Sequence, residues 1–162
     1  MDGGAGDDAI LIDGLSADGH FNVHLGEGAN DLALKNLDVG AAVMIAGGDG
    51  DDFVSIDGIA AGSLAVRLLG GNDTLNLEGF NADETNRARI QIDVGRGSDA
   101  ISLANVTAGN VHVLLGDGGN TLSARSVDAT RLQILGGKGK DSVSIDHSMF
   151  EEVFANYLGV IT

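Results

Sequence analysis

Apolar and polar residues alternate in short runs along almost the whole chain, and each run follows a loop rich in glycine. A period of two is that of a β-strand with one buried face. The loops recur, so the strands are expected to recur with them. The apolar pairs after the seven loops are Ile10/Ile12, Leu32/Leu34, Val54/Ile56, Leu75/Leu77, Ile101/Leu103, Leu122/Ala124 and Val143/Ile145.

A second alternating run lies before each following loop, for example Val43/Ile45 and Val111/Val113. Between the two runs stands one further apolar residue, three positions after the first run. These residues are Leu15, Leu37, Ile59, Phe80, Val106 and Val127. Each unit therefore reads as strand, variable corner, strand and glycine loop.

The seven glycine loops align with one another. They read "GGAGDDAILI", "LGEGANDLAL", "GGDGDDFVSI", "LLGGNDTLNL", "VGRGSDAISL", "LGDGGNTLSA" and "GGKGKDSVSI". The fourth position is always glycine: Gly6, Gly28, Gly50, Gly71, Gly97, Gly118 and Gly139. Two residues later comes Asp8, Asn30, Asp52, Asp73, Asp99, Asn120 or Asp141. The steps between these residues are 22, 22, 21, 26, 21 and 21, and the longest contains an insertion, "NADETNRAR" (81–89), which we interpret as a solvated loop.

A unit this short cannot bury its own apolar residues, but a stack of equivalent units can. We therefore expect an all-β protein, a parallel β-solenoid (β-roll or β-helix) of about seven coils. Residues 1–147 would form the repeats, and 148–162 either a last imperfect coil, with Phe154 and Leu158 in the buried ladder, or a capping helix. An antiparallel barrel or sandwich is the alternative, and it is disfavoured because antiparallel neighbours would not place like loops on like loops.

Composition narrows the function classes. The chain has 162 residues, 26 glycines, no proline and no cysteine, and its 9 basic and 24 acidic residues give a net charge of −15. Such a field repels nucleic acid and anionic membranes and attracts cations. No apolar run approaches the roughly 20 residues of a membrane-spanning helix. Because the chain seems to start and stop inside repeats, we expect a fragment of a longer protein.

Stacked loops would bring the Asp and Asn side chains to the strand spacing of about 4.8 Å. Like charges that close repel one another, and Ca²⁺, which takes six to eight oxygen ligands, would offset the repulsion. The alternative is that the loops are metal-free turns in which Asp or Asn caps neighbouring amides. Asn serves as well as Asp in that alternative.

The pattern Gly-Gly-x-Gly-x-Asp-x-apolar-x resembles the nonapeptide of the repeats-in-toxin, or haemolysin-type, calcium-binding family. "GGAGDDAIL", "GGDGDDFVS" and "GGKGKDSVS" match it in full. The resemblance implies a β-roll with several Ca²⁺ ions between stacked loops of a secreted or cell-surface bacterial protein. It implies Asp8, Asp52 and Asp141 as the best ligands and Asp73 and Asp99 next, with Asn30, Asn120 and the loop glycines completing the column. The chain departs from the family in having one such loop per 21–22 residues. Leu25, Leu68, Val94 and Leu115 replace the first glycine and are expected to extend the buried ladder.

No residues gather as a catalytic site would. His20, His24 and His112 are interpreted as surface residues, and no Ser-His-acid set is visible. We expect a non-catalytic, calcium-stabilised segment that acts as a spacer, adhesive rod or folding module, with surface glycans or neighbouring rods as partners. The alternatives are a fragment of a polysaccharide-active solenoid enzyme and a metal-free solenoid that assembles into fibres through its coil ends.

Overall fold

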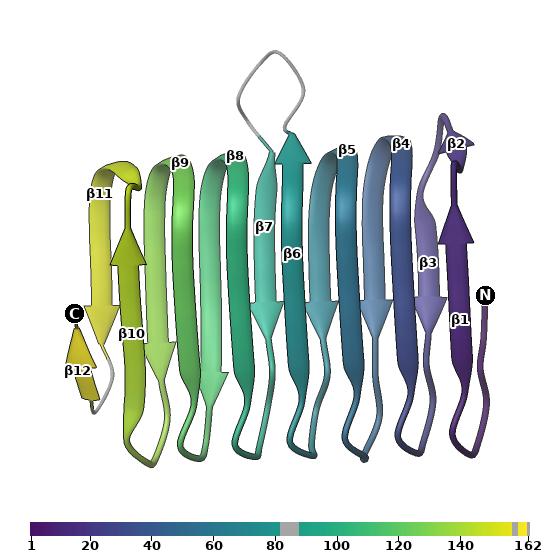
Figure 1. The fold of residues 1–162 in the computed structure, drawn as a ribbon, viewed down its shortest axis with the longest axis horizontal. Helices are drawn as coiled ribbons and strands as arrows, with labels where there is room; N and C mark the ends of the chain where they lie inside the picture. Colours follow the sequence, from purple (N-terminus) through teal and green to yellow (C-terminus); the bar gives the residue numbers. More distant parts are fainter. Residues whose placement is uncertain (82–87, 157–158, 162) are drawn as a thin grey trace.

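The computed structural model describes residues 1–81, 88–156 and 159–161, and it confirms the parallel β-solenoid of about seven coils (Figure 1). Every paired strand lies parallel to its neighbour, and no helix occurs in the described ranges. The strands are β1 (Ala9–Asp13), β2 (Ser16–Ala17), β3 (Phe21–His24), β4 (Asp31–Ala46), β5 (Phe53–Arg67), β6 (Thr74–Asn81), β7 (Arg89–Asp93), β8 (Ala100–Gly116), β9 (Thr121–Gly136), β10 (Asp141–Asp146), β11 (Met149–Asn156) and β12 (Gly159–Ile161).

Each coil is a flattened turn with one strand segment on each face. Long strands such as β4 and β5 run up one face, bend at the corner and return on the other. All glycine loops lie along one edge of the molecule and all corners along the opposite edge (Figure 1). Leu34 pairs with Ile56, Ile56 with Leu77, and Leu77 with Leu103, so the register follows the repeat even across the insertion. The insertion joins β6 to β7 at the corner edge, and residues 82–87 lie outside the described residues.

The core is one continuous set of apolar ladders between the two faces. The alternating residues predicted to point inward are buried in the central coils, as with Leu32, Ile56 and Leu77. Burying a side chain of this size contributes about 1.5–3 kcal/mol, and the ladder repeats that gain in every coil. The four apolar residues in place of the first loop glycine extend the ladder as expected, with exposed fractions of 0–1%: Leu25, Leu68, Val94 and Leu115.

A left-handed backbone residue bends every coil where the first strand segment ends, and the sequence pattern did not predict it. Asn36 and Asn105 have φ of 53°, and Gly58 and Gly79 have φ of 68°. Such a residue turns the chain so that the following apolar residue, for example Phe80, returns to the core. The seven equivalent positions are Gly14, Asn36, Gly58, Gly79, Asn105, Ser126 and His147.

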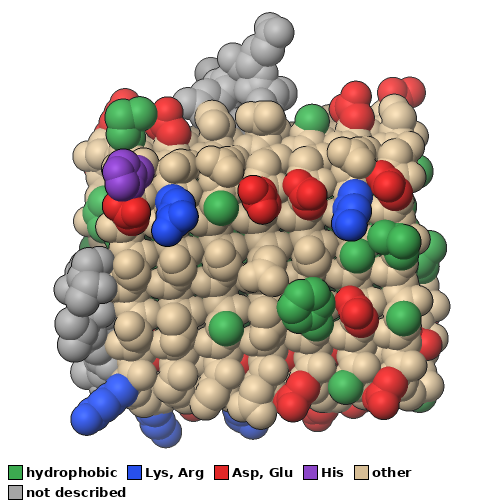
Figure 2. Space-filling model, viewed as in Figure 1, with side chains coloured by type: hydrophobic (Ala, Val, Ile, Leu, Met, Phe, Trp, Pro, Cys, Tyr) green, Lys and Arg blue, Asp and Glu red, His purple; other side chains and the backbone are tan. Residues whose placement is uncertain are grey.

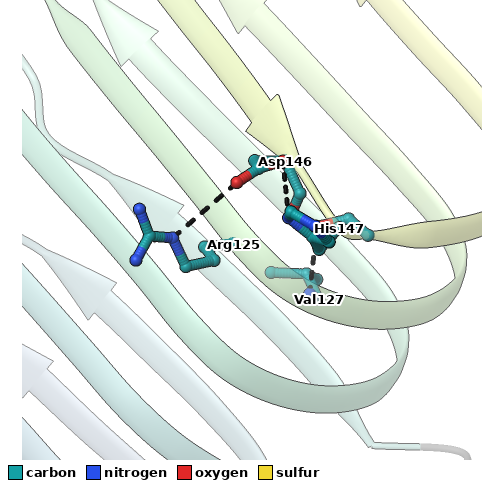
Figure 3. Close-up of polar contacts among 5 residues, drawn as sticks. Arg125, Val127, Asp146 and His147 are labelled. Carbon is teal, nitrogen blue, oxygen red and sulfur yellow. Dashed lines mark hydrogen bonds and ion pairs between the residues drawn. The ribbon is translucent and has the colours of Figure 1, made fainter.

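The last of these bends is tied by polar contacts (Figure 3). His147 Nδ1 lies 2.6 Å from Asp146 Oδ1, and Asp146 Oδ2 lies 3.9 Å from Arg125 Nε in the preceding coil. The Val127 amide donates to the Ser148 hydroxyl at 3.0 Å. Polar side chains therefore link the corner of one coil to the corner of the next.

The residues after this bend form a strand, β11, rather than a capping helix. The prediction that Phe154 belongs to the buried ladder is wrong. Phe154 lies opposite Gln133 on the outward side and is 54% exposed, whereas Val153 lies opposite Leu132 of the inward ladder. The constant step of 21 residues between β9 and β11 sets this register. The side chain of Leu158 lies outside the described residues.

Candidate metal site in the glycine-loop column

The glycine at the fourth loop position is required by the close approach of one loop to the next. Gly97 has a φ of 145°, and a Cβ on it would lie 1.6 Å from the carbonyl oxygen of Gly71. The same contact with the preceding loop recurs at Gly28, Gly50, Gly71, Gly118 and Gly139, at 1.6–2.4 Å. No other residue fits there, whether or not an ion is bound. Gly6 begins the column and meets no preceding loop in this chain.

The Asp and Asn side chains two residues later also form one column, but they point into the roll rather than to solvent at the loop tips. Asp73 is 1% exposed and Asp99 is 2% exposed. Asn30, Asp52, Asn120 and Asp141 are equally buried, at 1–3%, and Asp8 in the first coil is half-buried. The column is therefore an internal polar line beside the apolar core.

One oxygen of each side chain accepts a hydrogen bond from the coil before it. The Asp52 amide donates to Asp73 Oδ1 at 2.8 Å, and the Asp73 amide donates to Asp99 Oδ1 at 2.8 Å. The ladder runs without a break from the Asp8 amide to Asp141 Oδ1, with distances of 2.8–3.0 Å. The amide-capping arrangement, weighed from the sequence as an alternative to calcium, is thus present, and Asn and Asp fill it alike.

The second polar atom separates the two residue types. Asn120 Nδ2 donates to the Leu115 carbonyl at 2.7 Å, and Asn30 Nδ2 donates to the Gly28 carbonyl at 2.9 Å. In the aspartates this position is an oxygen and cannot donate. Five such atoms are buried without a hydrogen-bond partner: Oδ2 of Asp8, Asp52, Asp73, Asp99 and Asp141. A buried carboxylate oxygen without a partner carries a desolvation cost of several kcal/mol unless a proton or a cation reaches it.

The ionisation of the central aspartates reflects this cost. Burial raises the pKa of Asp73 to about 7, although the carboxylate accepts the Asp52 amide, and the charge of Asp99 adds to the rise. Burial likewise raises the pKa of Asp99 to about 6 and raises the pKa of Asp52. At neutral pH these side chains are therefore poised to take up a positive charge.

The loops have room for a carboxylate beside the backbone. A Cβ on Gly47 would lie 2.4 Å from Asp52 Oδ2, and one on Gly3 would lie 2.8 Å from Asp8 Oδ2. The described residues hold no group of three or more His, Cys, Asp or Glu side chains around one point. A Ca²⁺ ion in this column would therefore draw most of its six to eight oxygens from loop carbonyls and water, with Oδ2 as the charged ligand. The donor set fits a hard cation on those terms.

A second, outer ladder runs one residue before the buried column, and sequence reasoning missed it. The Ala29 amide donates to Asp7 Oδ1 at 2.9 Å, and the Ser98 amide donates to Asn72 Oδ1 at 2.9 Å. Asp51 accepts from the Asn72 amide in the same way. Acids and Asn at consecutive loop positions were the available signal. Part of the acidic excess in the loops is therefore used on backbone amides.

No protein-family model, curated protein or solved structure matches this chain. Within the described ranges, no helix is long and apolar enough to cross a membrane. Of the histidines, His20 and His24 are exposed as expected, but His112 is only partly exposed and its Nε2 atom is buried without a partner.

Proposed function

We propose that this chain is a non-catalytic solenoid segment, stabilised by calcium, of a secreted or cell-surface bacterial protein, and that it acts as a spacer, adhesive rod or folding module. The observation that supports this most directly is the line of buried aspartate Oδ2 atoms without hydrogen-bond partners. The other oxygen of these residues caps a backbone amide, which suits a structural part better than acid–base chemistry.

The loops differ in how much they would gain from an ion. Asn30 and Asn120 supply their own donor, so their loops need no positive charge. Asp52, Asp73 and Asp99 occupy three successive coils, and there the uncompensated charge is greatest. We therefore propose partial occupancy, centred on these three coils. Because a cation would bind the folded column and not the unfolded chain, its binding free energy adds to stability.

Protonation is the competing way to satisfy the column, and the raised pKa of Asp73 supports it. A protonated carboxyl donates one hydrogen bond, as the Asn amide does. The two alternatives differ in what stabilises the fold at pH 8, where protons are scarce and calcium still binds.

Thermal unfolding at pH 8 in millimolar CaCl₂ and in EGTA separates them. We expect calcium to raise the melting temperature, since a site filled at 100 times its Kd adds about 2.7 kcal/mol. MgCl₂ at the same concentration is the control and should have a much smaller effect, because Mg²⁺ dehydrates reluctantly and demands octahedral geometry. Equal melting temperatures in CaCl₂ and EGTA would refute calcium stabilisation and leave the amide-capped ladder as the whole function of the column.

A further inference from the structure

The face formed by the returning strand segments carries a polar array unlike the rest of the solenoid. Strands β7, β8 and β9 lie side by side there, with two residues of each pointing outward. The first row is Arg89, Asn110 and Arg131, and the second is Gln91, His112 and Gln133. Neighbours in a row are about 4.8 Å apart, the strand spacing. These side chains enclose a hollow of about 220 Å³.

The array is a single departure from the repeat. The equivalent outward positions on β5 are Ser63 and Ala65, which carry neither charge nor amide. On the other side, β11 presents Glu152 and Phe154. Guanidinium, amide and imidazole groups therefore gather only across three coils, on a chain whose net charge is −15.

His112 forms the floor of this hollow with Asn110. Both side chains are partly buried, and Nε2 of His112 is shielded from solvent with no hydrogen-bond partner among the described residues. A buried polar nitrogen without a partner is a cost that a ligand hydroxyl would remove.

Arg131 is held in place at the rim. Its Nε and Nη2 atoms donate to Glu152 Oε2 at 2.9 and 2.6 Å. A guanidinium has five donors, so it can bind a second oxyanion while it keeps this pair. Glu152 competes for the same charge, which makes it a test of any anion site here.

We propose that this array binds a sugar ring that bears a carboxylate, that is, a uronic acid residue of a saccharide. The arginines supply the charge that pairs with the carboxylate. The amides of Asn110, Gln91 and Gln133 and the imidazole of His112 each offer donors or acceptors, which ring hydroxyls use and a simple inorganic anion does not. The hollow is smaller than the 300–1,000 Å³ of drug-sized pockets, so one ring is its proper occupant. This site does not depend on calcium in the loops.

The test is a ¹⁵N-resolved NMR titration of the 162-residue chain with sodium glucuronate, with glucose and sodium sulfate as comparison ligands. We expect glucuronate to shift the side-chain signals of His112, Gln91 and Gln133 with a Kd on the order of 1 mM. Glucose and sulfate should each bind about tenfold more weakly, because one lacks the charge and the other the hydroxyls. Sulfate or glucose binding as tightly as glucuronate would overturn the proposal, as would shifts spread over the whole surface.

Three variants sharpen the result. Arg131→Gln should weaken glucuronate binding about tenfold, and Glu152→Gln should tighten it several-fold by removing the competing carboxylate. Arg67→Gln is the matched control, since Arg67 lies on the same face but outside the array and pairs with Asp93. Its Kd should equal that of the unchanged chain. Equal affinities for Arg131→Gln and Arg67→Gln, in proteins with unchanged amide spectra elsewhere, would contradict the assignment.

Discussion

At the scale of single residues, the loop column depends on glycines whose hydrogen atoms face the carbonyl of the loop before. Gly118 has a φ of 134°, and a Cβ on it would lie 1.6 Å from the Gly97 carbonyl oxygen. Its neighbour Gly119 lacks a positive φ, and a Cβ there would lie 3.6 Å from the nearest heavy atom outside its chain neighbours, an ordinary contact. Two adjacent glycines in one loop therefore have different physical reasons to be glycine.

We predict that Gly118→Ala lowers the free energy of unfolding by about 3 kcal/mol or more, because both the backbone conformation and the packing of the loops oppose a side chain. Gly119→Ala is the matched control and should change it by less than about 0.5 kcal/mol. Urea unfolding followed by circular dichroism measures both. Similar losses in the two variants would show that loop packing is not what selects the column glycine.

Leu69 is the one non-glycine residue at the second loop position, and its backbone has a φ of 76°. The side chain is 46% exposed, so it contributes little packing in exchange for that conformation. We predict that Leu69→Gly stabilises the chain by about 1 kcal/mol, the cost of left-handed backbone for a residue with a side chain, less the entropy of glycine. Calorimetry should show a higher melting temperature, and a lower one would mean that the exposed leucine packs better than its exposure indicates.

At the scale of the strand and its loop, the buried Asp ladder couples stability to pH. The pKa of Asp73 is about 7 in the folded chain against an ordinary value of 3.8, so between these values the folded state binds more protons than the unfolded state. Stability must then fall as pH rises through that window and stay low above it. For metal-free protein we predict a loss on the order of 3 kcal/mol between pH 4 and pH 8 from this residue.

Asp73→Asn should flatten that dependence and make the metal-free chain more stable at pH 8. The amide keeps an oxygen for the Asp52 backbone and adds a donor of the kind that Asn30 and Asn120 use. Melting temperatures across the pH range in chelator give the slope, and Asp128→Asn, at an exposed position of β9, is the control. Parallel slopes for the parent chain and Asp73→Asn would mean that Asp73 is not the residue that takes up the proton.

The strands and their register could be predicted from the sequence because alternation and a step of 21–22 residues leave one way to stack the units. Leu34, Ile56 and Leu77 meet as their spacing requires. The direction of the Asp side chains could not be predicted, since a loop tip and a buried line have the same spacing. The left-handed bends were missed although Asn36, Gly58 and Asn105 are residue types that favour them. Phe154 was misplaced because a helical and a strand spacing were both compatible with a short apolar tail.

At the scale of the whole molecule, each coil contacts only the coils on either side of it. Stability in such an array is a sum of coil terms and nearest-neighbour terms, so position along the axis changes the value of a residue even when the ladder is the same. Ile12, Leu34 and Ile56 occupy one ladder. Ile56 is 1% exposed, between two coils, whereas Ile12 in the first coil is only partly buried.

We therefore predict that Ile56→Ala costs about 3–4 kcal/mol and Ile12→Ala about 1 kcal/mol, although the same atoms are removed. Hydrogen exchange should show the same gradient, with the slowest amides in β5, β6 and β8 and faster exchange in β1 and β11. Ile12→Ala should speed exchange only in the first two coils, because a coil that opens at the edge breaks a single interface. Ile56→Ala should speed exchange on both sides of β5, since it weakens the two interfaces that this coil makes. Equal costs for the two substitutions, with uniform exchange along the axis, would mean that the solenoid unfolds as one indivisible unit rather than coil by coil.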